Sequence, residues 1–200
     1  MISDIIAITN TGENLSAALD LSRKVAAYGD LSPKNALHLR LLAEEMLGMM
    51  RSITGEVSGK FWIEAEDEEY QLHMQVDSAL TKERRQGLLA ASSTGKNEGS
   101  RTFMGRLREF LFGPVDEEIA AYDNSVLAAG VLPNGTRPMT DWEWLLTRYQ
   151  GNLSNLKAEK PEAADAWDEL EKSIVGNVAD DVRVSIQGGK TEMTIIKKLV

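Results

Sequence analysis

Two hairpins of alternating apolar and polar residues, one in the middle of the chain and one at its end, constrain the fold more than any other feature. In the first hairpin, a turn at Asp67 and Glu68 pairs Ile63 with Leu72. The same register brings together two further apolar pairs, Ala65 with Tyr70 and Phe61 with Met74. A slip of one residue would move every apolar side chain to the other face, so the pattern predicts this register strongly.

The second hairpin turns at Gly188 and Gly189, a pair of residues typical of two-residue turns. Across this turn Val184 faces Met193. The remaining pairs are Ile186 with Thr191 and Val182 with Ile195. Each hairpin therefore has one apolar and one polar face. This pattern is typical of an antiparallel sheet that helices cover on one side only.

Residues 32–53 predict a long helix. Ser32 can cap its first free amides, and Pro33 suits the first helical position. Apolar residues recur at helical spacing along it: Leu39, Leu42, Met46, Met49, Met50 and Ile53. Glu44 and Glu45 lie in its most apolar part. An unpaired carboxylate is costly to bury, so two alternatives are open for these glutamates. A carboxylate can reach solvent or form a salt bridge at the edge of the helix, or it can face a functional site.

Other segments complete a strand-and-helix pattern. A run of β-branched residues predicts a strand at 3–9. Apolar residues at helical spacing predict helices at 14–28, 101–112 and 161–175. Residues 115–160 look like an addition to this core. Within the addition, Thr140 and Glu143 form a capping box that predicts the start of a helix.

Composition excludes several classes of protein. The 200 residues include 42% hydrophobic residues, enough for an ordinary core, and carry a formal charge of −9, which argues against a general nucleic-acid binder. The absence of cysteine excludes disulfides, thiolate metal sites and a cysteine nucleophile. The start of the chain has no signal-peptide pattern, and no run approaches the ~20 apolar residues of a membrane span. We therefore expect a soluble cytoplasmic protein.

The order of elements is strand, helix, helix, hairpin, polar glycine loop, helix, helical insert and hairpin. It resembles the GHKL (histidine-kinase-like) ATPase superfamily, in particular single-domain proteins similar to anti-sigma-factor serine kinases. The likeness is strongest in AYGDLSPKNALHLRLLAEEMLGMM and VRVSIQGGKTEMTIIKKL. It implies one domain over residues 1–200, with a helical insertion at about 115–160. The implied fold is an α+β two-layer sandwich, a mixed and mostly antiparallel sheet with helices on one face.

In that family the long helix carries a glutamate, followed four residues later by an asparagine that holds Mg²⁺. The resemblance therefore implies catalytic roles for Glu44 and Glu45. Four residues after them the sequence has Gly48 and Met49, neither of which offers the oxygen donor that a hard cation requires.

The family also has an aspartate that recognises adenine and a glycine-rich lid that holds phosphates. The resemblance assigns nucleotide binding to the residues that match these motifs, Asp77, Gly95, Lys96, Asn97, Gly99 and Arg101. The glycines expected after the aspartate are missing from VDSALTK, and the lid is a partial match rather than a P-loop. The aspartate can equally end a strand, and the lid can be a flexible loop. The two histidines, His38 and His73, have no ligand partners in the sequence, so we predict no metal site from them.

Two functions stay open. The altered motifs favour a degenerate GHKL-like domain, a regulatory protein without catalysis that binds a protein partner and has lost or weakened ATP binding. The alternative is an ATP-binding serine kinase of the anti-sigma-factor type, with ATP and Mg²⁺ as cofactors and a sigma-factor-like or antagonist protein as partner. Under both we expect neither nucleic acid nor membrane as partner, and a homodimer stays open.

Overall fold

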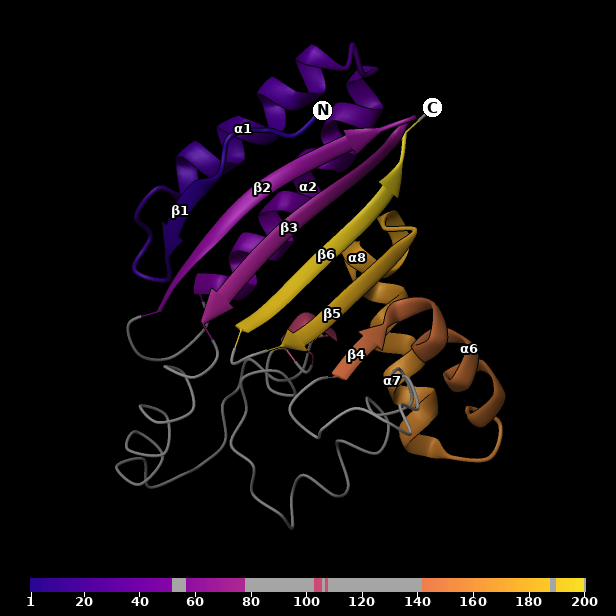
Figure 1. Ribbon diagram of the computed structural model, residues 1–200. Helices are drawn as coiled ribbons and strands as arrows, with labels where there is room; N and C mark the ends of the chain where they lie inside the picture. The colour runs from indigo at the N-terminus through magenta and orange to yellow at the C-terminus, as the bar shows by residue number, and fades with distance from the viewer. Residues whose placement is uncertain (52–56, 78–102, 106, 108–141, 188–189, 200) are drawn as a thin grey trace.

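The computed structural model describes residues 1–51, 57–77, 103–105, 107, 142–187 and 190–199. Its strands form one sheet in the order β1-β2-β3-β6-β5-β4, and each neighbouring pair is antiparallel. The helices α1, α2 and α8 lie behind this sheet in Figure 1. The predicted α+β class is confirmed, and the likeness to the GHKL fold stays a prediction.

The strands are β1 (Ile6–Thr9), β2 (Ser58–Glu66), β3 (Glu69–Asp77), β4 (Trp142–Leu145), β5 (Asp181–Gln187) and β6 (Lys190–Lys198). The helices are α1 (Leu15–Tyr28), α2 (Pro33–Arg51), α6 (Leu146–Leu156), α7 (Pro161–Lys172) and α8 (Ile174–Val178). Ser32 caps α2 as predicted, since its Oγ accepts a hydrogen bond from the Asn35 amide at 3.3 Å. Across the part of the chain that the structure describes, none of the helices has the length and apolar character to cross a membrane.

Both hairpin registers are confirmed residue by residue. Ile63 lies opposite Leu72 in the first, and Val184 lies opposite Met193 in the second. The first turn places Asp67 and Glu68 at positive φ, 45° and 68°, a region that Gly and Asn adopt more readily. The alternation of apolar side chains therefore determines this register, even though the two turn residues do not favour positive φ.

The core lies between the sheet and its helical layer. The side chains that α2 turns toward the sheet are fully buried, as are their partners on the strands: Leu39, Leu42, Met46, Met50, Phe61, Ile63 and Leu72. At the β4 side of the sheet, Trp144 and Tyr149 pack with ring centroids 5.5 Å apart, and Phe103 lies 5.9 Å from Tyr149. The apolar face that the sequence predicts is thus covered from β1 to β4.

The prediction that Thr140 and Glu143 form a capping box is wrong for Glu143, the one of the two residues that the structure describes. Glu143 belongs to β4, opposite Ser185, and helix α6 begins only at Leu146. Trp144 explains the difference, because it pairs with Val184 and is completely buried when the segment is extended. Thr140 itself, most of the predicted helix at 101–112 and most of the 115–160 addition lie outside the described residues.

The predicted helix at 161–175 is divided at Ser173. This residue has an extended backbone, and its Oγ accepts the Gly176 amide at 2.8 Å, so it caps the short helix α8. The predicted helix ends at residue 175, but Gly176 lies inside α8. A Cβ at this position would come within 2.3 Å of the Leu170 carbonyl oxygen, which explains why glycine is needed here.

Two glycine substitutions test this packing in opposite directions. Gly176→Ala should lower the free energy of unfolding by about 1–3 kcal/mol, because the added methyl group meets backbone. Gly48→Ala should raise it by about 0.5–1 kcal/mol, since a Cβ on this exposed position of α2 has no neighbour within 4 Å. Urea unfolding monitored by circular dichroism measures both, and equal effects of the two variants would contradict the packing at α8.

Candidate functional site

The two carboxylates of α2 have different surroundings. Glu44 points outward and pairs with Arg40 one turn earlier, with 2.9 Å between Arg40 Nε and Glu44 Oε1. Both side chains are substantially exposed, 60% for Arg40 and 40% for Glu44, so the pair contributes little to stability. Glu44 therefore follows the solvated alternative of the sequence analysis.

Glu45 is half-buried, and the described residues offer its carboxylate no hydrogen-bond or ion-pair partner. Burial raises the pKa of the Glu45 carboxyl above its usual value, and the neighbouring charge of Glu44 raises this pKa further. A carboxyl group in this state exchanges a proton more readily near neutral pH than an exposed glutamate does.

The residues that follow the two glutamates by one helical turn differ in exposure. Met49 is 3% exposed and belongs to the hydrophobic core. Gly48 lies on the exposed side of the helix. A buried thioether is a soft donor in an apolar setting, whereas Mg²⁺ takes hard oxygen ligands. In α2, then, the position to which the resemblance assigns the metal ligand is used for packing.

The other predicted nucleotide residues are only partly described. Asp77 is the last residue of β3, with its backbone paired to Lys190 of β6. The predicted phosphate-binding residues Gly95, Lys96, Asn97, Gly99 and Arg101 lie outside the described residues. Of the predicted site residues, the structure therefore describes Glu44, Glu45 and Asp77, and the nucleotide site stays a prediction.

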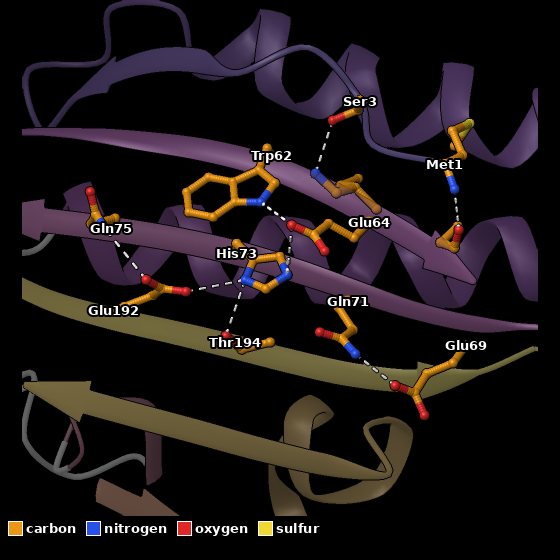
Figure 2. A network of polar contacts seen from close by, with 12 residues as sticks. Met1, Ser3, Trp62, Glu64, Glu69, Gln71, His73, Gln75, Glu192 and Thr194 are labelled. Atoms are coloured by element: carbon orange, nitrogen blue, oxygen red, sulfur yellow. Dashed lines mark hydrogen bonds and ion pairs between the residues drawn. The ribbon is translucent and has the colours of Figure 1, made fainter. Parts of the chain in front are cut away.

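A cluster of polar side chains that the sequence analysis did not find lies on the opposite face of the sheet. Trp62 of β2 stacks on His73 of β3, with ring centroids 4.8 Å apart and planes 2° from parallel. Figure 2 shows the His73 ring between the carboxylates of Glu64 and Glu192, with the Trp62 ring beside it. We call this face, the one that carries Trp62 and His73, the open face.

Each carboxylate in this cluster is held by a fixed donor. The Trp62 indole N–H donates to Glu64 Oε1 at 2.9 Å, and the Gln75 amide donates to Glu192 Oε2 at 3.3 Å. His73 Nδ1 lies 3.3 Å from Glu192 Oε1 and 3.2 Å from Thr194 Oγ1 (Figure 2). Because the groups that contact these carboxylates come from the adjacent strands β2 and β3, the sheet itself orients both carboxylates.

His73 is buried, as is its neighbour Thr194. The His73 side chain is only 9% exposed, and its Nε2 has no hydrogen-bond partner among the described residues. The nearest acceptor is Glu64 Oε1, at 3.9 Å. The described residues contain no group of three or more histidine, cysteine, aspartate or glutamate side chains that could hold a metal ion.

The first-hairpin register could have revealed half of this cluster. It places Trp62 directly opposite His73, an aromatic pair on a face that otherwise reads as polar. The other half depends on the pairing of β3 with β6, which puts Thr194 opposite His73 and Glu192 opposite Gln75. No local sequence pattern specifies that pairing.

No protein-family model, curated protein or solved structure matches this chain.

Changing Glu45 should alter how stability depends on pH. The raised pKa means that the folded state holds this proton more tightly than the unfolded chain. The resulting stability is complete below the ordinary glutamate pKa and is lost as pH rises through the folded-state pKa. Glu45→Gln should therefore gain stability relative to wild type between pH 4 and pH 7, as measured by urea unfolding at each pH.

Glu44→Gln is the matched control for this measurement. It removes the second cause of the shift and leaves burial, so the pH dependence that Glu45 gives should shrink without disappearing. If the difference between Glu45→Gln and wild type is the same at pH 4 and pH 7, Glu45 does not titrate differently in the folded state.

Removing His73 should disturb the open-face cluster. His73→Ala leaves Thr194 and one oxygen of Glu192 without their contacts, and we expect a loss of about 1–3 kcal/mol in the free energy of unfolding. The control is Gln71→Ala on the same strand and face, whose side-chain amide donates to Glu69, two residues away on the same strand, at 2.7 Å. A His73 variant no less stable than this control would show that the cluster does not hold the strands together.

Proposed function

We propose that this chain is a regulatory domain without catalysis, a degenerate GHKL-like protein that binds a protein partner and has lost or weakened ATP binding. The observation that carries the proposal is the burial of Met49. This side chain stands where the resemblance calls for the asparagine that holds Mg²⁺, and it packs in the core at 3% exposure.

The physical basis is the role of the metal in phosphoryl transfer. Mg²⁺ bridges the phosphates and neutralises the charge that develops as the phosphoryl group moves, and little other chemistry is left to the protein. A core methionine cannot take over this role by a change of rotamer, because its neighbours close around it. A domain that keeps the helix and loses the ligand retains an architecture suited to binding. We place this regulatory protein in the cytoplasm.

Glu45 favours a second candidate, an ATP-binding serine kinase of the anti-sigma-factor type. A half-buried carboxyl with a raised pKa is the usual form of a general base, and in the resemblance this residue activates the attacking group. In that case Asp77 would recognise adenine, and the partner would be a sigma-factor-like or antagonist protein.

Thermal unfolding with and without nucleotide separates the two candidates. We expect no change in the midpoint with Mg-ATP or Mg-ADP at millimolar concentration. A bound nucleotide at 100 times its dissociation constant would stabilise the fold by about 2.7 kcal/mol, a shift of several degrees. A shift that Asp77→Ala abolishes and Glu44→Gln retains would favour the kinase and contradict our proposal.

A further inference from the structure

We propose that the open face, next to β1, binds a cationic amphipathic helix of the partner protein. This inference rests on the proposed function and names the chemistry of the partner. Two observations on the same face carry it, namely a strip of exposed apolar side chains and carboxylates held in fixed positions beside that strip.

The apolar strip is formed by the start of the chain. Among the described residues, three of the five exposed large hydrophobic side chains are Met1, Ile2 and Ile5, with 44%, 69% and 60% exposure. Ile2 lies opposite Glu64 in an isolated bridge, so its side chain is on the open face. Ile5 directly precedes β1, and its exposure shows that it does not share the core packing of its neighbour Ile6.

The strip is ordered by hydrogen bonds to β2. The Ser3 amide donates to the Ile63 carbonyl at 2.9 Å, and the Ile63 amide donates back to Ser3 Oγ at 2.9 Å. The ammonium group of Met1 donates to the carbonyl of Ala65 (Figure 2). Exposed apolar residues held together in this way mark interaction sites more often than scattered ones do.

Acidic side chains border the strip. Glu64 and Glu192 are 41% and 32% exposed, and each has one oxygen held by the donors described above. Glu66 and Glu69 form a directly opposed pair further along the same strands. Lys60 lies on the other side of Trp62, and Lys198 lies opposite Glu69, so the acidic part of the face is the stretch between these two lysines, around Glu64, Glu66 and Glu192. Because these carboxylates are positioned before binding, a cation meets them at little entropic cost.

This arrangement selects among possible occupants of the face. A helix with an apolar stripe and a row of lysines or arginines beside it would cover Ile2 and Ile5 and meet the carboxylates at the same time. A second copy of this chain is disfavoured, because a two-fold contact would bring the same carboxylates against one another. The formal charge of −9 also favours a basic partner.

Three synthetic peptides of about 18 residues, each labelled for fluorescence anisotropy, test the inference against the full chain. The first has leucine at helical spacing on one side and lysine on the other, the second has glutamate in place of lysine, and the third is a scrambled form of the first. We expect the first to bind about tenfold or more tightly than the other two, and to weaken as salt is raised.

Variants then locate the site. Ile2→Ser with Ile5→Ser should weaken binding of the lysine peptide about tenfold, and Glu64→Gln with Glu192→Gln should weaken it by a similar factor. The matched control is Leu37→Ser with Glu44→Gln, an exposed apolar and an exposed acidic residue on the helical layer, which should change binding less than about twofold. Thermal unfolding of each variant confirms that it folds.

Several outcomes would overturn the inference. The first is a control variant that weakens binding of the lysine peptide as much as the open-face variants do. The second is open-face variants that bind the lysine peptide as tightly as the unmodified chain does. The third is a scrambled peptide that binds as tightly as the lysine peptide. A dimer in sedimentation velocity that Ile5→Ser dissociates would show that a second copy occupies the face. A nucleotide-dependent shift in unfolding would instead overturn the proposed function and leave the peptide result intact, so the two failures can be told apart.

Discussion

The pairing of β3 with β6 is the interaction on which the rest of the structure depends. It runs in unbroken register from Glu69 opposite Lys198 to Asp77 opposite Lys190 and joins the two hairpins into one sheet. On the covered face it aligns Met74 with Met193 and so makes the core continuous. On the open face it aligns His73 with Thr194 and completes the cluster around the stacked rings.

The local parts of this fold were predictable and the non-local parts were not. Both hairpins follow from alternation alone, even where Asp67 and Glu68 adopt positive φ in the turn. The strand at Trp144 was missed because a capping box and helical spacing are also present there, and only the neighbouring β5 decides between them. The different surroundings of Glu44 and Glu45 depend on tertiary packing, which no spacing rule contains.

The two faces of the sheet divide the chemistry of the molecule. On the covered side, burial removes Met49 from any role at a surface and leaves Glu45 with a raised pKa. On the open side, polar residues are oriented by one another, and a nearly buried histidine sits between two carboxylates. Polar contacts fix His73 Nδ1 and both carboxylates, so the cluster gives the open face a defined shape rather than a loose set of side chains, although His73 Nε2 has no hydrogen-bond partner among the described residues.

The distance in sequence between the paired strands has a consequence for synthesis of the chain. His73 and Glu192 are separated by 119 positions, which a ribosome covers in roughly 6–24 s at about 5–20 residues per second. During that interval β3 has been made and its partner strand has not. The edge of β3 that pairs with β6 then stays without its partner, and the apolar face of the first hairpin lacks the core residues that the second hairpin supplies. An unpaired strand edge beside an exposed apolar face favours aggregation of the nascent protein during this period.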